Sequence, residues 1–252
     1  MEINLNKKSI LVTGSSKGIG RVIALTLAKA GASIWACARS KTDLTSLKKE
    51  MDKFGKGHGI INVDLMNEDG VFELTEALKN NQVQPDIIIH NLGGSLQIRD
   101  PLASADNFAE VWKYNLGVSI DLNRILIPQM KSRGWGRIIH LSSLSTTTYD
   151  GNLAYITAKC GLNGYVRGMG RELAKDGIVI SAVAPGLVEL KGRYFTDLKD
   201  NNPAQLEAYF DNHLPLRRMV QPEEVAKLIL TLCSSIADPM SGSIIPIDGG
   251  GH

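Results

Sequence analysis

The chain has 252 residues, of which 43% are hydrophobic and 21% are charged, and its formal net charge is +2. This length and composition are typical of a globular protein with one large domain or two small ones. Acidic and basic residues are mixed throughout, so no basic stripe predicts a nucleic-acid partner. No apolar run approaches the ~18 residues of a membrane span, so no membrane partner is expected.

Cysteine and histidine usage points away from disulfides and metals. Cys37, Cys160 and Cys233 are far apart and odd in number, which fits a reducing compartment. The histidines show no metal-ligand spacing, so no metal is expected. The first residues, MEINLNKKSILVTG, lack the apolar core and cleavage site of a signal peptide. We therefore expect a cytoplasmic protein.

Short β-rich runs alternate with helical patterns along the chain. Strands are predicted at residues 9–13, 33–38, 59–63, 86–90, 137–142, 179–184 and 243–247. These runs are continuously apolar, as expected for parallel strands covered on both faces. Helical patterns follow at 19–27, 104–131, 153–175 and 222–234. The alternation predicts one Rossmann-like α/β domain over residues 1–252, a doubly wound parallel seven-stranded sheet with helices on both faces.

One segment, at about 187–221, interrupts this alternation. It separates a strand from the next helix by far more than the usual two to six residues. A long insertion after the carboxyl end of a strand could be a lid over a ligand site. The alternative is an additional surface helix, which the run AQLEAYF allows.

A glycine-rich loop, TGSSKGIG at 13–20, joins the first strand to the first helix. Gly14 suits a tight turn, Gly18 a close approach to phosphate, and Gly20 the packing of helix on strand. The helix N-terminus then offers free N–H groups to a pyrophosphate. The loop could also be only a tight turn, but its position predicts a nucleotide site. The expected cofactor-binding residues are Gly14, Ser16, Lys17, Gly18, Ile19 and Gly20.

The end of the second strand bears on the choice between the two nicotinamide cofactors. NAD sites usually carry an acidic residue there, whereas this chain reads CARS, with Arg39 and no acid. Lys17 is expected nearby. Two cations without a carboxylate favour a 2′-phosphate, so NADP(H) is predicted over NAD(H). The alternative is that both are ordinary solvated charges.

Tyr155 and Lys159, in AYITAK, are four residues apart on a predicted helix, so their side chains are neighbours. An adjacent ammonium favours the phenolate, and together with a bound nicotinamide cation in a partly desolvated cleft it would lower the tyrosine pKa from its usual value of about 10. Such a tyrosine could exchange a proton with a carbonyl or alcohol oxygen. Taken alone, the pair could be a chance surface pair.

Five motifs occur together in order: TGSSKGIG, LSS at 141–143, YITAK, APG at 184–186 and IDGG at 247–250. With these motifs the chain resembles the short-chain dehydrogenase/reductase family, in its compact single-domain branch. The resemblance covers nearly the whole chain and is highly specific, because all five motifs are in register.

The resemblance implies residue roles. Tyr155 would be the general acid/base, Lys159 would lower its pKa and bind the nicotinamide ribose, and a serine would hydrogen-bond the substrate oxygen. Asn115 would hold a water in a proton relay. Further cofactor contacts are implied for Asp64, Leu65, Asn91, Gly93, Pro185, Gly186 and Val188.

The position of the catalytic serine is ambiguous. Counting forward through GRIIHLSS selects Ser143, whereas counting back from Tyr155 with the family's interval selects Ser142. Strand register determines which face a side chain takes, while the following loop can absorb a deletion. This argument favours Ser143.

Other positions depart from the family pattern. His90 replaces an asparagine and is expected to pack rather than react, and Leu190 replaces a threonine that contacts the cofactor. Cys160 points away from Lys159 on the helix and is expected to be a small buried residue.

These residues lead to several hypotheses about function. The first is an NADPH-dependent carbonyl reductase, reversible as an alcohol dehydrogenase, whose substrate could be a 3-oxoacyl thioester. A sugar, polyol or other secondary-alcohol dehydrogenase is the alternative, followed by a non-catalytic dinucleotide sensor and an epimerase or dehydratase. Lys191 and Arg193 could meet a substrate carboxylate or phosphate, or be solvated charges. The resemblance also implies a homo-oligomer, either a dimer or a tetramer.

Overall fold

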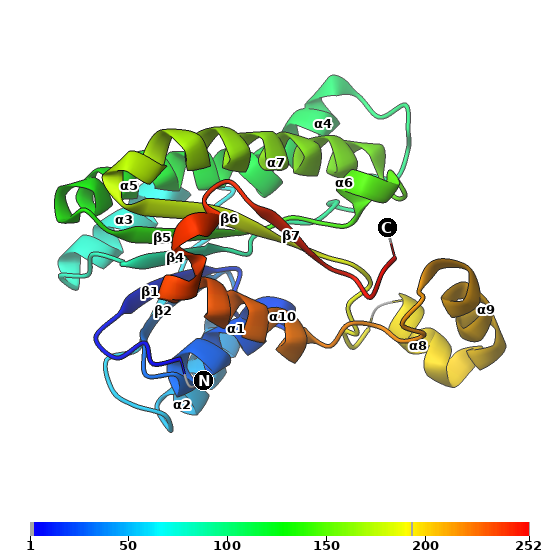
Figure 1. Ribbon diagram of the computed structural model, residues 1–252, viewed down its shortest axis with the longest axis horizontal. Coiled ribbons are helices and arrows are strands. Elements are labelled where there is room, and N and C mark those ends of the chain that lie inside the picture. Colours follow the sequence, from blue (N-terminus) through cyan, green and yellow to red (C-terminus); the bar gives the residue numbers. More distant parts are fainter. Residues whose placement is uncertain (1–2, 193, 252) are drawn as a thin grey trace.

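Seven parallel strands form one sheet in the order β3-β2-β1-β4-β5-β6-β7 (Figure 1). The computed structural model describes residues 3–192 and 194–251, so Arg193 lies outside the described residues. The strands are β1 (Ser9–Thr13), β2 (Ser33–Ala38), β3 (Gly59–Asn62), β4 (Ile87–His90), β5 (Gly136–Leu141), β6 (Ile178–Pro185) and β7 (Ile244–Ile247). The predicted doubly wound sheet is confirmed, with strand ends within a residue or so of the expected positions.

Helices cover both faces of the sheet (Figure 1). One face carries α1 (Gly18–Lys29), α2 (Lys41–Met51) and α10 (Pro222–Leu232). The other carries α3 (Gly70–Asn80), α5 (Val118–Arg133) and α7 (Leu153–Leu173). The helical patterns of the sequence did not predict α2 or α3. Short 3-10 turns, η2 (Ala174–Asp176) and η3 (Ser235–Met240), precede β6 and β7.

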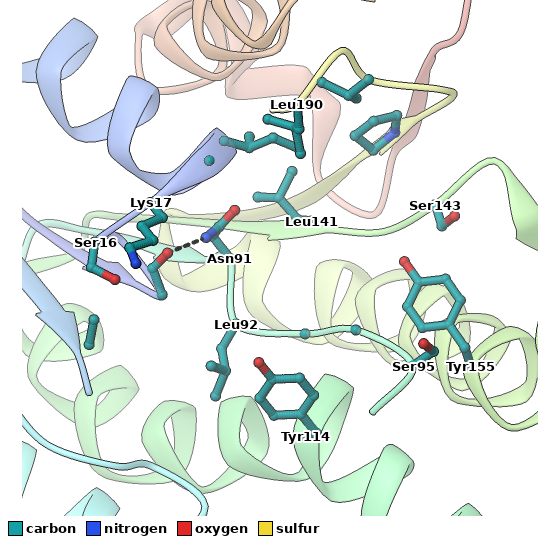
Figure 2. Close-up of a pocket in the computed structure, with 18 of the residues that line it drawn as sticks. Ser16, Lys17, Asn91, Leu92, Ser95, Tyr114, Leu141, Ser143, Tyr155 and Leu190 are labelled. Atoms are coloured by element: carbon teal, nitrogen blue, oxygen red, sulfur yellow. Dashed lines mark hydrogen bonds between the residues drawn. The ribbon is translucent and has the colours of Figure 1, made fainter. Parts of the chain in front are cut away.

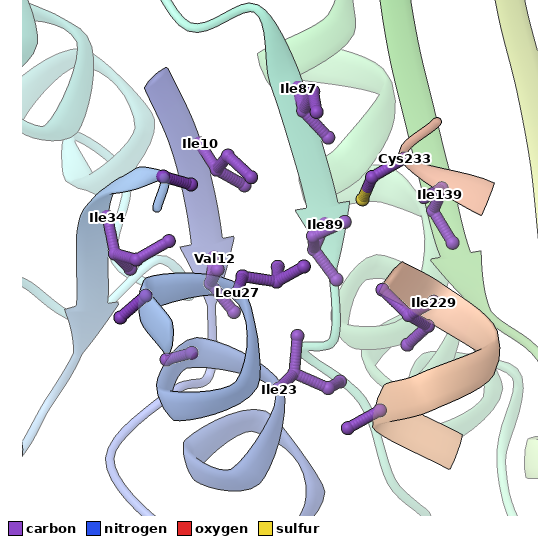
Figure 3. Close-up of a cluster of buried hydrophobic side chains, with 14 of the residues drawn as sticks. Ile10, Val12, Ile23, Leu27, Ile34, Ile87, Ile89, Ile139, Ile229 and Cys233 are labelled. Carbon is purple, nitrogen blue, oxygen red and sulfur yellow. The ribbon is translucent and has the colours of Figure 1, made fainter. Parts of the chain in front are cut away.

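Two hydrophobic clusters, one on each face, form the core. Ile10 and Val12 of β1 pack against Ile23 and Leu27 of α1, while Leu11 between them belongs to the cluster on the opposite face (Figure 3). Successive strand residues point to opposite faces, so a strand covered on both sides needs apolar residues at every position. This explains the continuous apolar runs.

The helix predicted over 104–131 is interrupted. It consists of α4 (Ala105–Trp112), a π-helical turn η1 (Lys113–Gly117) and α5. At the end of the turn the Val118 N–H donates to the Lys113 carbonyl, five residues back. π-Turns inside α-helices often mark functional sites, and this one contains Asn115.

The long segment after β6 forms two helices, α8 (Tyr194–Asn201) and α9 (Pro203–His213), beyond the carboxyl end of the sheet (Figure 1). A bridge between Val188 and Val220 joins its two ends. The helices enclose a small hydrophobic cluster of their own, with Leu198, Leu206 and Phe210 buried. The run AQLEAYF is helical, within α9. A separate cluster lets this segment keep its shape without joining the main core.

Within the described ranges, no helix has both the length and the apolar character needed to cross a membrane. A search of the same residues found no group of three or more histidine, cysteine, aspartate or glutamate side chains arranged to hold a metal ion.

Candidate active site

A cleft of about 1270 Å³ lies across the carboxyl ends of the strands, where β1 and β4 are neighbours and the chain order reverses. Open α/β sheets bind ligands at such a switch point. Ligand pockets usually measure ~300–1,000 Å³, so this cleft has room for a dinucleotide and a second small molecule. All of the predicted site residues except Gly20 and Asn115 line it.

The glycine loop between β1 and α1 has the conformation expected for phosphate binding. Gly14 and Gly18 have φ of +62° and +56°, a region that side chains rarely adopt. No side chain caps the N-terminus of α1, where Lys17 is the capping residue. The first N–H groups of α1 therefore remain available to an anion, and the loop fits a dinucleotide pyrophosphate.

Asn91, just after β4, holds this loop in place (Figure 2). Its side-chain Nδ2 donates to the carbonyl of Gly14 at 2.9 Å and to that of Thr13 at 3.2 Å. A Cβ on Gly20 would lie 2.4 Å from this nitrogen and from the Gly14 carbonyl, so only glycine fits there. Gly20 thus supports the cleft from behind rather than lining it.

At the adenosine end of the cleft, both predicted cations pair with carboxylates. The Lys17 Nζ lies 3.1 Å from Asp43, and an Arg39 guanidinium nitrogen lies 3.8 Å from Asp64. The expectation of no carboxylate here is wrong, because Asp43 also lines the cleft. Hydrogen bonds from Ser40 and then Lys17 lower the pKa of Asp43. The signal in the sequence was the Ser40 N-cap, which brings Asp43 into the first turn of α2.

At the other end of the cleft, Ser143 and Tyr155 lie together (Figure 2). Ser143 follows β5, and Tyr155 lies in the first turn of α7. The Ser143 hydroxyl donates to the Ser145 Oγ at 3.1 Å, and Ser143 faces Tyr155 closely enough to affect its pKa. Lys159, one turn further along α7, has its Nζ 5.6 Å from the centre of the Tyr155 ring and donates to the Leu141 carbonyl at 2.6 Å. Three of the four predicted catalytic side chains thus meet at this end.

Ser142 points elsewhere. Its buried hydroxyl donates to the Asn163 Oδ1 of α7 at 2.6 Å. Consecutive residues in an extended segment face opposite sides, so only one of the two serines can reach Tyr155. The geometry brings Ser143, and not Ser142, to the tyrosine.

Burial dominates the electrostatics of this group. It raises the pKa of Tyr155, and the hydrogen bond with Ser143 opposes that rise. Burial also lowers the pKa of Lys159 to about 7. In the chain without a bound cofactor, the Tyr155 pKa is therefore raised, and the expected lowering by Lys159 is not seen. The expected lowering also required a bound nicotinamide cation; in the chain without it, the cost of taking both groups out of water dominates.

Asn115 lies behind the cleft at the level of Lys159. Its Nδ2 donates to the carbonyls of Gly94 and Val111, both at 2.8 Å, and its Oδ1 accepts from the Gly94 N–H. A Cβ on Gly93 would lie 2.6 Å from the Asn115 Oδ1 and 3.2 Å from the Lys159 Nζ. The structure thus brings the Asn115 side chain and the Lys159 ammonium next to the same glycine.

The departures from the family pattern have structural explanations. His90 is buried and does not line the cleft; its ring stacks on His140 with centroids 4.5 Å apart. Leu190 does line the cleft, beside Pro185, Gly186 and Val188. Cys160 is only partly buried and does not line the cleft.

Several lining residues are absent from the sequence-based site. They include Asp43, Leu92, Ser95, Gln97, Arg99, Tyr114, Asn152, Tyr194, Phe195 and Thr196. Half of these, namely Leu92, Ser95, Gln97, Arg99 and Asn152, lie on loops whose course the sequence patterns do not predict. The start of the long segment was expected near the site, and it supplies several of these residues.

Comparisons with known proteins agree with this geometry. A family model described as enoyl-(acyl carrier protein) reductase matches residues 14–252. The chain is 34% identical to 3-oxoacyl-[acyl-carrier-protein] reductase FabG of Aquifex aeolicus, with 99% of each protein covered. It is 28% identical to 7alpha-hydroxysteroid dehydrogenase of Escherichia coli K12, with 99% of this chain and 96% of that protein covered. Among solved structures, L-sorbose reductase from Gluconobacter frateurii, complexed with NADPH and L-sorbose, superimposes with a TM-score of 0.91 at 30% identity, covering 100% of this chain and 98% of the other.

The chain belongs to the short-chain dehydrogenase/reductase family. It is an NAD(P)-dependent oxidoreductase that acts on CH–OH and C=O groups.

Proposed function

We propose that this enzyme reduces a carbonyl group to an alcohol with NADPH, reversibly. The observation that carries the proposal is that Ser143, Tyr155 and Lys159 line one end of the cleft together, with Lys159 one helical turn from Tyr155. Bound NADPH supplies the hydride. The glycine loop would hold its pyrophosphate, and Pro185, Gly186 and Val188 would lie along its nicotinamide.

The catalytic roles follow from where the hydroxyls lie. Ser143 and Tyr155 line the same end of the cleft, where a substrate oxygen could accept from both hydroxyls. Ser143 holds that oxygen as negative charge develops, and Tyr155 donates the proton. A raised pKa keeps Tyr155 protonated at neutral pH, which suits a proton donor. Lys159 binds the nicotinamide ribose, and Asn115 positions a water that returns protons from solvent.

A preference for NADPH is supported by the two cations at the adenosine end. The side chains of Lys17 and Arg39 are 77% and 68% exposed. Exposed ion pairs are worth only ~0–1 kcal/mol, so Lys17 and Arg39 can turn toward a 2′-phosphate at little cost. The NADPH bound by the L-sorbose reductase is consistent with this. Asp43 is the residue that argues for NADH instead.

Two substrate classes fit the relatives. The similarity to FabG supports a 3-oxoacyl thioester. The structural similarity to L-sorbose reductase supports a sugar or polyol, and the polar side chains of Ser95, Gln97 and Asn152 in the cleft favour such a substrate.

The test is the turnover of NADPH with a panel of 3-oxoacyl thioesters, keto sugars, keto acids and cyclic ketones. Replacing Tyr155 with phenylalanine should reduce kcat by roughly 10²–10⁴-fold, because the proton donor is lost, while NADPH binding persists. A sensor would show no turnover to lose. Equal or better use of NADH by the native protein would overturn the cofactor preference.

Three expectations about the whole protein stay predictions. They are a homo-oligomer, a cytoplasmic location, and closure of the segment 187–221 over the substrate. The last is supported by the lining contributed by Leu190, Tyr194 and Phe195.

A further inference from the structure

The loop after β4 has an uncommon backbone at the substrate end of the cleft. Leu96 and Gln97 are consecutive non-glycine residues with φ of +51° and +64°. Such conformations cost about 1–3 kcal/mol each and persist where the surroundings hold them, often at binding sites. The loop is held at Gly94 by two hydrogen bonds with Asn115, and Ile98 packs in the same small cluster as Tyr155.

This backbone directs alternate side chains of the loop into the cleft. Ser95, Gln97 and Arg99 line it, whereas Leu96 and Ile98 do not. Figure 2 shows Ser95 at the same end as Ser143 and Tyr155. A guanidinium nitrogen of Arg99 donates to the Gln97 Oε1 at 3.5 Å, so the two long side chains lie together. The strained turn thus presents a polar group that includes a cation.

The charged residues that line the cleft fall into two sets, paired and unpaired. Its acidic lining residues, Asp43 and Asp64, pair with Lys17 and Arg39 at the adenosine end. Arg99 forms no ion pair within the described part of the chain, and neither does Lys191, which lines the cleft from the segment after β6. The loop that carries Ser95 to the substrate end therefore also carries a positive charge at Arg99, and no lining carboxylate pairs with it.

From this arrangement we infer that the substrate carries an anionic group, a carboxylate or a phosphate, which Arg99 binds while Ser143 and Tyr155 hold the carbonyl oxygen. The inference rests on the proposed carbonyl reduction and specifies its substrate class. A guanidinium offers two parallel N–H donors that match a carboxylate or phosphate. Gln97 accepts a hydrogen bond from Arg99, and Lys191 is a second cation among the lining residues.

The experiment compares acids with neutral analogues that differ only in charge. The kcat/KM with NADPH is measured for oxohexanoates with the carbonyl at C2 to C5, each beside its methyl ester. A second arm compares dihydroxyacetone phosphate with dihydroxyacetone, and distinguishes phosphate from carboxylate. A neutral 3-oxobutanoyl thioester of N-acetylcysteamine completes the set. We expect one acid or the phosphate to exceed its neutral analogue by at least tenfold.

Arg99→Gln should lower that charged-to-neutral ratio roughly 10- to 100-fold, because charge-assisted hydrogen bonds are lost. Arg99→Lys should fall between Arg99→Gln and the native protein. Arg171→Gln, an exposed arginine near the end of α7, is the control and should leave the ratio unchanged. NADPH binding, measured by nicotinamide fluorescence, verifies that each variant is folded.

Two results would overturn the inference: neutral substrates reduced as well as their charged analogues, or an unchanged ratio in Arg99→Gln. Either result, with Tyr155-dependent reduction of some neutral ketone, leaves the proposed function standing. Absence of NADPH-dependent reduction of every compound would instead contradict the proposed function itself.

Discussion

The Ser143–Tyr155 pair shows how burial and hydrogen bonding set the chemistry of single residues. Burial raises the pKa of the phenol and the serine hydroxyl opposes it, while burial takes the pKa of Lys159 down to about 7. The chain alone therefore holds a neutral phenol beside a lysine that is only partly charged at neutral pH. A neutral phenol can donate a proton, as the proposed carbonyl reduction requires.

Replacing either serine with alanine should separate the two candidates. Ser143→Ala should lower kcat by roughly 10²–10³-fold, because a donor to the developing oxyanion is lost. It should also move the ionisation of Tyr155 to higher pH, since the hydrogen bond that opposes the raised pKa is gone. Ser142→Ala should leave kcat nearly unchanged and cost about 1–3 kcal/mol of unfolding free energy, because Asn163 loses its buried partner.

Steady-state kinetics across pH and denaturant unfolding of both variants provide the measurements. A large loss of kcat in Ser142→Ala, with Ser143→Ala active, would reverse the assignment.

At the scale of elements, the nucleotide end of the cleft is assembled by two strands. The glycine loop leaves β1, and the amide that holds it comes from the residue after β4. Because β1 and β4 are neighbours in the sheet, a contact between residues 77 positions apart becomes local. The tight approach at Gly20 shows how closely α1 packs against this junction.

A methyl group at Gly20 should disrupt this junction. Gly20→Ala places a Cβ 2.4 Å from the Gly14 carbonyl, which is backbone and cannot simply move aside. We expect a loss of about 1–3 kcal/mol in unfolding free energy and at least a tenfold weaker NADPH affinity, because the loop must shift. Denaturant unfolding and fluorescence titration with NADPH test both effects.

Gly55→Ala is the matched control, since its nearest atom would be a side-chain nitrogen at 3.9 Å. Equal behaviour of the two variants would show that the close approach at Gly20 does not constrain the loop.

At the scale of the whole molecule, a buried polar cluster lies between the sheet and the helices α5 and α7. His90 and His140 stack on neighbouring strands, and the His90 Nε2 lies 2.9 Å from the Asn123 Oδ1. Asn123 in turn donates to the Tyr165 hydroxyl at 3.1 Å. Burial lowers the pKa of His90 from 6.5 to about 4 and lowers that of His140 as well. Both rings are therefore neutral in the folded protein at neutral pH.

Stability should consequently fall as pH is lowered. Between about pH 6.5 and 4 the unfolded chain binds a proton at His90 that the folded chain does not, so the unfolding free energy decreases over that window. The contribution of His90 is at most about 3.5 kcal/mol, because each pKa unit is worth about 1.4 kcal/mol. Urea unfolding of the native protein and of His90→Asn is measured from pH 7.5 to 4. The unfolding free energy of the variant should decrease less steeply with falling pH than that of the native protein.

His213→Asn, at an exposed position on α9, should retain the native slope. Identical slopes for the native protein and His90→Asn would contradict the prediction.

The sequence by itself determined the order and type of the main elements and the nucleotide loop. Apolar runs at β1 and β4 and the glycines at 14, 18 and 20 constrain only their own neighbourhoods, so local rules suffice to read them. The same holds for Tyr155 and Lys159, because helical spacing makes them neighbours in any helix.

Only the tertiary structure decided what depends on contacts between distant segments or on burial. The pairing of Lys17 with Asp43 joins the glycine loop to α2, and the Arg99 side chain reaches the cleft through a turn that propensities do not favour. The raised pKa of Tyr155 and the lowered pKa of Lys159 arise from desolvation, which the packing of α7 on the sheet produces. Water exclusion is a property of the assembled fold, and no spacing along the chain encodes its magnitude.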